Sequence, residues 1–243
     1  LLDKKYKGFS RNGANLSDEK KAKLRAIDKE LSQLKLKFGE HILAETNAFE
    51  MHLTDESELS GLPDGTKEAA KQLAENKNKS GWLITLDYPS YIPFMTYADN
   101  RVLREKLSKA FGSKGFNNDD LDNQNIVLKL AQLRFERAQL LGYKRHAHFV
   151  LEERMAETPE KVNTFLNELL EKAKPAAKKE FKKLEAFSKD LDAIDQLQKW
   201  DSGYYSEKLK QKLFSLDDEQ LKPYFKLENV INGAFTVAQK LFG

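Results

Sequence analysis

The sequence contains no cysteine, so disulfide bonds, thiolate nucleophiles and cysteine-type zinc sites are all excluded. It also lacks a large charge of either sign, since 41 lysines and arginines are balanced by 38 acids to give a net charge of +3. These charges are interspersed, which argues against a nucleic-acid groove or a polybasic membrane patch. No apolar run approaches the roughly 20 residues needed to cross a bilayer. We therefore expect neither nucleic acid nor a membrane as a partner.

The motif of a helix-borne zinc site is missing as well. There is no His-Glu-x-x-His, in which two imidazoles four residues apart hold one zinc ion and the glutamate acts as base. His146 and His148 are two residues apart, which places them on opposing sides of a helix. His41 and Glu45 are four apart and offer two ligands, whereas a catalytic zinc ion needs three ligands and a water. We predict no catalytic residue and no metal ligand in this chain.

What the sequence does contain is a helical pattern of apolar residues. Ser17 is a suitable N-cap for a helix running to about Asn47, which carries a narrow apolar seam with three- and four-residue steps. Thr158 and Pro159 mark the start of another long helix, which Pro175 should kink or split. The seam of the first helix consists of Leu24, Ile27, Leu31, Leu34, Phe38 and Ile42. Further helices are expected over residues 66–76, 100–112, 126–141, 146–155, 205–214 and 228–242.

The predicted fold class is all-α, an irregular multi-helix bundle with long helices and at most one short extended element. That element is Trp82–Leu86, which is rich in aromatic and β-branched residues. We expect the chain to stay extended through Pro89 and Pro93, because a proline disfavours the helical conformation of the residue before it. Pro223 similarly predicts a turn into an extended Tyr224–Phe225 segment. Residues 1–15 are expected to be a lead-in that ends in a loop.

One aromatic block, Trp200–Leu209, has two interpretations. Tyr204 and Tyr205 lie beside Asp201 and could line a peptide groove, because tyrosine combines contact area with hydrogen bonding. Alternatively, Asp201 caps the helix that contains Tyr205, and the aromatic side chains pack beneath that helix. We retain Asp201, Tyr204 and Tyr205 as substrate-channel candidates.

Four blocks together resemble the thimet oligopeptidase and peptidyl-dipeptidase Dcp family of zinc metallopeptidases. They occur in the family's order and extend over most of the chain, and the N-terminal part is most similar to the Dcp branch. The blocks are Thr85–Phe94 with Asn100–Lys106, Leu133–Tyr143, Trp200–Leu209 and the segment from Leu221 onwards.

The resemblance implies a mostly helical protein with a deep channel between two lobes. It implies a zinc ion held by His-Glu-x-x-His and a distant glutamate, and cleavage of short peptides, with removal of C-terminal dipeptides in the Dcp branch. The resemblance stops upstream of the zinc motif, so none of the family's zinc ligands can be transferred to this chain. On this basis, residues 1–243 are expected to be a helical region of a larger two-lobed peptidase, with a candidate sub-boundary near residues 193–204.

We therefore expect a channel-wall fragment of a Dcp-like peptidyl-dipeptidase, inactive alone and completed by a C-terminal catalytic part that holds the zinc ion. The alternative is a self-standing helical protein-binding module. Short peptides are the expected substrates of the whole enzyme. The apolar face of the last helix, if left uncovered, would promote self-association. A cytoplasmic location is expected, with a periplasmic one left open.

Overall fold

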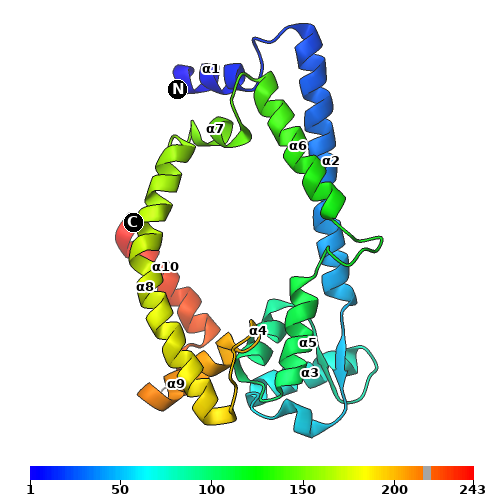
Figure 1. Ribbon diagram of the computed structural model, residues 1–243, viewed down its shortest axis with the longest axis vertical. Helices are drawn as coiled ribbons and strands as arrows, with labels where there is room; N and C mark the ends of the chain where they lie inside the picture. Colours follow the sequence, from blue (N-terminus) through cyan, green and yellow to red (C-terminus); the bar gives the residue numbers. More distant parts are fainter. Residues whose placement is uncertain (216–219) are drawn as a thin grey trace. The chain divides into compact units, whose positions relative to one another are not determined.

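The computed structural model describes residues 1–215 and 220–243 (Figure 1). In these residues the regular structure is helical apart from two short strands, so the predicted all-α class is confirmed. The chain divides into two compact units. Unit 1 comprises residues 1–49 and 109–180, and unit 2 comprises residues 50–108 and 181–243. The sub-boundary expected near residues 193–204 falls inside unit 2 and stays a prediction.

Unit 1 is built around the pair of helices α2 (Asp18–Ala48) and α6 (Gln124–Leu140), which lie side by side in Figure 1. The Ser17 hydroxyl accepts the Lys20 N–H at the start of α2, as predicted. The predicted seam of α2 meets α6 in a small core. Its buried residues are Leu31, Ile126, Leu130 and Leu133, and the half-buried Ile27, Leu34 and Phe38 pack against them. The unit also contains α1 (Leu2–Arg11), α7 (His146–Leu151) and the first part of α8 (Pro159–Asp192).

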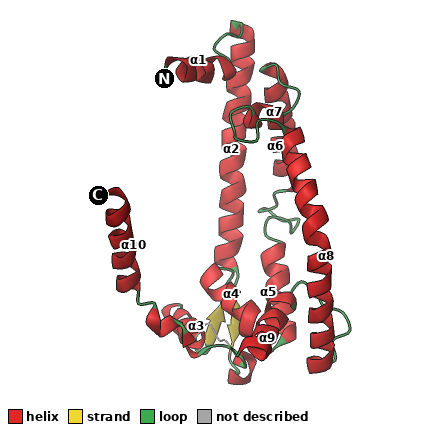
Figure 2. Ribbon diagram, turned by 90° about the vertical axis from the view of Figure 1, so that its left-hand side faces the viewer, coloured by secondary structure: helices red, strands yellow, loops and turns green. Residues whose placement is uncertain are grey.

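Unit 2 combines a two-stranded sheet with short helices. Strand β1 (Met51–Leu53) pairs antiparallel with β2 (Trp82–Ile84), and the register places His52 opposite Leu83. Figure 2 shows the two strands beside α3, and α3 and α4 both contact β2. The helices of this unit include η1 (Glu56–Leu59), α3 (Asp64–Asn76), α4 (Tyr88–Tyr97), α5 (Arg101–Gly112), α9 (Ser202–Phe214), η3 (Lys222–Tyr224) and α10 (Leu227–Phe242).

The prolines break the chain less than the sequence predicts. The expected extended stretch through Pro93 is wrong, because α4 already begins at Tyr88 with Pro89 in its first turn, where a helix needs no N–H donor. Helix α8 also continues through Pro175, so the predicted split is wrong. The hydrogen bond that Pro175 cannot make would reach an exposed stretch of α8, where water can satisfy the carbonyl.

The two terminal segments are also more helical than expected. Residues 2–11 form α1 rather than an irregular lead-in, and the predicted turn follows at Asn12 and Gly13, where Gly13 has a φ of +92°. Tyr224 lies in a 3₁₀ turn with Pro223, so the expected extended Tyr224–Phe225 segment is wrong. Proline's fixed φ is compatible with such a turn. Among the described helices, none has both the length and the apolar content required to span a membrane.

Candidate functional site

The three channel candidates lie together at the start of α9 in unit 2, around the carboxylate of Asp201. This side chain is fully buried. Arg101 donates two hydrogen bonds to it, from Nε to Oδ1 at 2.9 Å and from Nη2 to Oδ2 at 2.7 Å. Arg104 Nη2 adds a third at 3.2 Å, and the backbone N–H of Gln198 a fourth at 2.9 Å. A buried carboxylate is stable only with such compensation.

The partners of Asp201 set its charge. Burial alone would raise the pKa of this carboxyl, but the hydrogen bonds from Arg101, Gln198 and Arg104 outweigh it, so the pKa lies below its usual value. Asp201 is therefore ionised at neutral pH and cannot act as a proton donor there. Its chemistry is that of a fixed anion that orients two guanidinium groups.

Arg104 ties several segments of unit 2 to this anion. Its side chain is 1% exposed and donates to the carbonyls of Ala98 at 2.7 Å, Asp99 at 3.1 Å and Trp200 at 3.1 Å. The guanidinium also lies 4.0 Å from the centre of the Tyr204 ring. A planar group with five donors can satisfy such a set of acceptors, which a lysine could not. Arg104 thereby fixes α5, the end of α4 and the start of α9 relative to one another.

Asp99 is the second anion of the cluster and lies closer to solvent. It accepts hydrogen bonds from the hydroxyls of Tyr204 at 2.8 Å and Ser60 at 2.7 Å, and Lys208 Nζ lies 3.3 Å away. Burial alone would raise the pKa of Asp99. The three groups together lower it by more than burial raises it, so the net shift is downward. Gly61 is required here, because at its φ of +84° a Cβ would lie 2.2 Å from the Tyr97 carbonyl oxygen.

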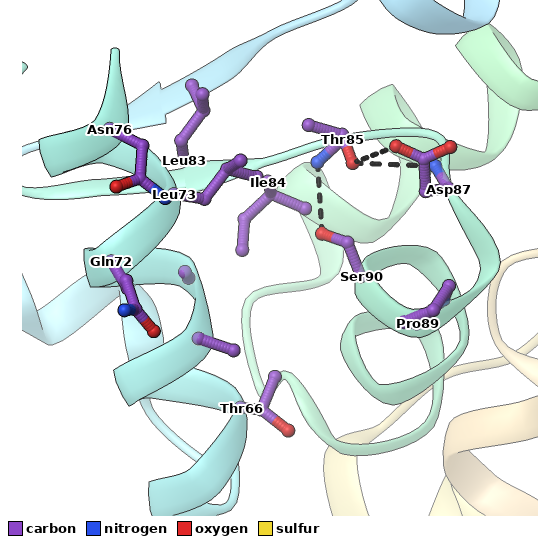
Figure 3. Close-up of a pocket in the computed structure, with 12 residues that line it drawn as sticks. Thr66, Gln72, Leu73, Asn76, Leu83, Ile84, Thr85, Asp87, Pro89 and Ser90 are labelled. Atoms are coloured by element: carbon purple, nitrogen blue, oxygen red, sulfur yellow. Dashed lines mark hydrogen bonds between the residues drawn. The ribbon is translucent and has the colours of Figure 1, made fainter.

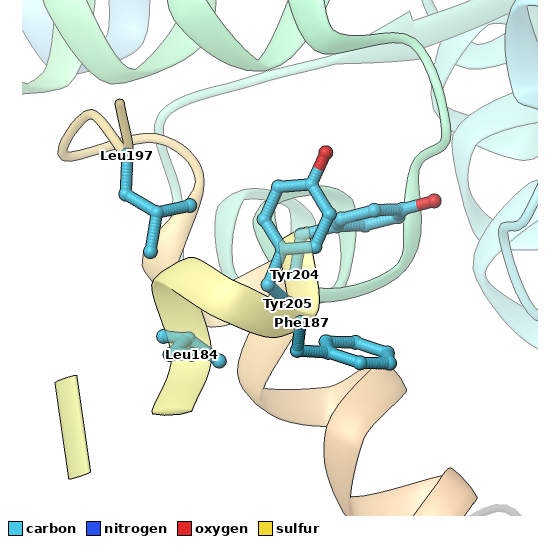
Figure 4. Packing of buried hydrophobic residues seen from close by; sticks show 5 residues of the cluster. All are labelled: Leu184, Phe187, Leu197, Tyr204 and Tyr205. Atoms are coloured by element: carbon cyan, nitrogen blue, oxygen red, sulfur yellow. The ribbon is translucent and has the colours of Figure 1, made fainter. Parts of the chain in front are cut away.

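Both tyrosines are held by apolar packing and by one hydrogen bond each. Figure 4 shows their rings with Phe187 and Leu197 in a buried cluster that also contains Leu184. The Tyr205 hydroxyl donates to Asp192 Oδ2 at 2.9 Å, and burial together with this carboxylate raises the Tyr205 pKa to about 12. Burial and Asp99 likewise raise the pKa of Tyr204. Both phenols are therefore neutral hydrogen-bond donors at neutral pH.

A polar pocket of about 410 Å³ adjoins this cluster. Its walls come from the loop before α3, the end of α4 and one face of α9, where Glu207, Lys208 and Gln211 line it. Lys208 thus joins the pocket to Asp99 and Tyr204. Glu207 is almost fully buried and pairs with Lys210 at 2.8 Å. The pocket offers charged groups of both signs to a ligand, but the carboxylate of Glu207 is already paired with Lys210.

A second pocket of about 290 Å³ lies between α3, β2 and the start of α4 (Figure 3). Leu73, Leu83 and Ile84 form part of its apolar wall, and the amides of Gln72 and Asn76 project from α3. Across the pocket, Ser90 accepts the Thr85 N–H at 3.0 Å, and Thr85 donates to Asp87 at 3.2 Å. These polar groups mainly satisfy one another and the first turn of α4.

None of these features is a metal centre. Among residues 1–215 and 220–243, no group of three or more histidine, cysteine, aspartate or glutamate side chains is placed to hold a metal ion. Glu45 instead accepts the Gly115 N–H at 2.7 Å and the Asn117 amide at 3.0 Å. The described residues therefore do not fit the zinc ion that the resemblance implies.

The sequence interpretation found the centre of the cluster but missed its partners. Asp201, Tyr204 and Tyr205 do come together, and their side chains are buried; their place in a substrate channel stays a prediction. Asp201 is the N-cap residue of α9 by position, but its side chain makes no capping hydrogen bond. Arg101, Arg104 and Asp99 were not singled out. The three-residue spacing of the two arginines places them on one helix face, and this was the available signal.

Comparison with known proteins gives one family over most of the chain. The model of peptidase family M3 matches residues 94–243. Oligopeptidase A of Salmonella typhimurium is 40% identical over 246 residues, covering 100% of this chain and 36% of the relative. Dipeptidyl carboxypeptidase of Escherichia coli is 31% identical over 245 residues, again covering 100% and 36%. The "Probable cytosolic oligopeptidase A" of Arabidopsis thaliana is 36% identical over 252 residues, with the same coverages. The chain thus spans about a third of the length of these relatives.

Proposed function

Because the chain belongs to peptidase family M3, we propose that it is a non-catalytic, helical part of a zinc metallopeptidase that cleaves short peptides. The observation that carries this proposal is the 40% identity to an oligopeptidase along the whole chain, together with coverage of 36% of that relative. Zinc in such an enzyme polarises the scissile carbonyl and activates water. In this proposal the ligands of the ion come from sequence outside the 243 residues.

The proposed role of the Asp201 cluster is to hold one wall of the substrate channel. All three side chains are buried, and two of them support this role: Asp201 holds Arg101, and the Tyr204 ring lies under Lys208. Tyr205 packs edge-on against Tyr204. The side chains of Arg101 and Lys208 are 37% and 35% exposed. We propose that the exposed edges of Arg101 and Lys208 face the channel.

The test is a direct assay of the purified 243-residue chain. We expect no hydrolysis of short fluorogenic peptides with or without added Zn²⁺, and no zinc retained after dialysis, measured by atomic emission. Zinc-dependent turnover that a chelator abolishes would overturn the proposal. The gene sequence beyond the codon for Gly243 supplies an independent test, since the proposal requires a His-Glu-x-x-His there.

The narrower hypothesis is removal of C-terminal dipeptides. Identity is higher to oligopeptidase A, at 40%, than to dipeptidyl carboxypeptidase, at 31%, which favours the broader oligopeptidase activity. The two activities are distinguished by giving the whole enzyme the same peptide as a free acid and as a C-terminal amide. Cleavage of the free acid but not of the amide would support the peptidyl-dipeptidase hypothesis.

A self-standing binding module is the second candidate function, and the surface of α10 favours it. This helix buries none of its residues, and Phe235, Leu241 and Phe242 are among its exposed apolar side chains. In our first proposal this face packs on further protein of the same enzyme, and in the isolated chain it promotes self-association. A stop codon directly after Gly243 would favour the module. A cytoplasmic location is proposed because the Arabidopsis relative is described as probably cytosolic.

A further inference from the structure

The part of α8 that belongs to unit 1 carries an exposed apolar stripe. Its members recur at three- and four-residue steps and therefore share one face of the helix. The four large side chains among them are between 51% and 64% exposed. Single exposed apolar residues are ordinary, but a continuous stripe of them marks a surface that binds a partner. The stripe consists of Phe165, Leu166, Leu169, Leu170, Ala173, Ala176 and Ala177.

The same stripe is buried further along the helix. Leu184 and Phe187 continue its spacing, and each is only 8% exposed, because they pack with Leu197, Tyr204 and Tyr205 in the cluster of Figure 4. This face of α8 therefore packs on protein wherever a partner is present. We expect the exposed part of the stripe to do the same.

The middle of the stripe favours a second helix as the covering element. Residues 173–177 include three alanines, and short side chains at a contact allow two helix axes to approach closely. A lipid surface would gain little at this segment, because helices that lie on membranes bind through large apolar side chains. The alanine segment is thus more typical of helix packing than of membrane binding.

Both borders of the stripe are positively charged. Neighbouring residues of a helix point about 100° apart, so Lys172 and Lys174 lie on the two sides of Ala173. Neither lysine makes an ion pair with a described residue, whereas Lys189 near the end of α8 pairs with Asp195 at 3.0 Å. A surface that covers the stripe is complementary to these borders if it carries carboxylates there.

We propose that this face of α8 binds a helix from the C-terminal part of the whole enzyme, which crosses α8 at residues 173–177 and carries carboxylates opposite Lys172 and Lys174. The inference rests on the proposed function, in which the chain is about a third of a longer peptidase. A second copy of the chain fits less well, because a two-fold contact sets the same lysines against each other. Helix α10 also fits less well, since its charged residues are one glutamate and one lysine.

The first experiment compares hydrogen exchange in the 243-residue chain and in the whole enzyme, meaning the full product of the gene, by mass spectrometry. A partner that covers a helix suppresses the local opening through which its amides exchange. We expect residues 163–179 to exchange at least about tenfold more slowly in the whole enzyme. Residues 126–133 are the internal control and should change much less, because Ile126, Leu130 and Leu133 are already buried in the α2–α6 core.

Variants then test the charge of the partner. Lys172→Glu combined with Lys174→Glu should speed exchange of residues 163–179 several-fold in the whole enzyme, because it sets like charges against each other, and should change little in the 243-residue chain. Lys182→Glu is the matched control, since this lysine follows Ala173 by nine residues and lies on the opposite face of α8. Retained protection of residues 126–133 shows that each variant is folded. Equal effects of Lys182→Glu and the double variant would contradict the proposal.

The outcomes separate this inference from the proposed function. Unchanged fast exchange of residues 163–179 in a whole enzyme that hydrolyses peptides would overturn the inference and leave the function standing. Protection of these residues in a longer protein without peptidase activity would support the docked helix and contradict the function. A gene that ends at the codon for Gly243 would overturn both.

Two other occupants of the face are tested with Leu169→Asp in the whole enzyme. A dimer in light scattering that this variant dissociates would assign the face to a second copy. Binding to phosphatidylglycerol vesicles that this variant abolishes would assign the face to a lipid surface. Either result would overturn the proposal.

Discussion

Unit 1 and unit 2 each contain an arginine that lies over an aromatic ring and pairs with a carboxylate, but the surroundings differ. In unit 1, Arg11 Nε lies 2.5 Å from Glu152 Oε2 and its guanidinium 4.7 Å from the centre of the Phe149 ring. The Glu152 side chain is 39% exposed. In unit 2, Arg104 and Asp201 are 1% and 0% exposed. Arg11 itself is 14% exposed, so the same chemistry occurs once with a solvent-exposed carboxylate and once wholly in the interior.

The difference matters because water decides what an ion pair contributes. At the surface, solvent screens the attraction and readily replaces a lost partner, so such a pair typically contributes less than about 1 kcal/mol. In the interior, removing one partner leaves a charge without compensation, which costs about 3–5 kcal/mol. We therefore expect unit 2 to be far more sensitive than unit 1 to changes in its arginine cluster.

The largest expected effect is that of Arg104→Ala. It removes a hydrogen bond to Asp201 and leaves the carbonyls of Ala98, Asp99 and Trp200 without their donor, so we expect a loss of about 3–5 kcal/mol of unfolding free energy. Urea unfolding followed by tryptophan fluorescence measures it, because both tryptophans, Trp82 and Trp200, belong to unit 2. Arg101→Ala is the control and should have a smaller effect, since Arg101 is partly exposed. Equal effects of the two variants would contradict the role of burial.

Acid should weaken unit 2 through the same carboxylates. The pKa values of Asp201 and Asp99 are lowered in the fold, so their contribution to stability is present above the unfolded value of about 4 and is lost as the pH falls through the lower folded values. The urea midpoint from tryptophan fluorescence should therefore fall between about pH 5 and pH 3. In Asp99→Asn this decrease should be shallower, and an identical pH profile would show that Asp99 plays no part.

Tyr205→Phe tests a single buried hydrogen bond. It removes the donor to Asp192 and keeps the apolar packing, so we expect a loss of about 1 kcal/mol. Because the Tyr205 pKa is raised to about 12, the contribution of this tyrosine is complete below about pH 10 and is lost as the pH rises through 12. Urea unfolding at pH 7 measures the loss. Tyr224→Phe, at an exposed tyrosine, should change nothing.

Glu152→Gln should give the smallest effect. The surface pair with Arg11 is lost, but Arg11 still donates to the Phe149 carbonyl and to the Tyr143 hydroxyl at 3.3 Å. We expect less than about 1 kcal/mol, and less still at high salt. Thermal unfolding by circular dichroism at low and high salt checks this, with Glu168→Gln on α8 as control. A loss as large as that of Arg104→Ala would remove the contrast between the two units.

The helices were predictable because their signals are local. The seam from Leu24 to Ile42, the cap at Ser17 and the Thr158–Pro159 start all act within a few residues of the chain. The errors occurred at prolines. A helix can continue through a proline where the carbonyl that would have accepted its N–H finds another partner, such as water, and the sequence does not show whether it does. Strand β1 was missed because Met51–Leu53 has no strand pattern of its own and is extended only through its pairing with β2.

The candidate site was predictable only in part. The aromatic and acidic residues at 201, 204 and 205 are adjacent in sequence, so their association needed no tertiary information. Arg101 and Arg104 are about a hundred residues away from Asp201, and only the tertiary fold of unit 2, in which α4 packs against α9, brings them together. Whether a carboxylate is exposed or buried likewise depends on this packing. The sequence alone therefore could not distinguish a groove lining from an interior anchor.

The short sheet of unit 2 has a consequence for how this region would respond to a protease. Three residue pairs join Met51–Leu53 to Trp82–Ile84, so the two ends of the segment between the strands are held beside each other. A peptide bond cut outside α3, in residues 54–63 or 77–81, would leave the two new pieces joined through the paired strands, with α3 still packed on β2. Such a nicked molecule should remain assembled and separate into fragments only when it is denatured.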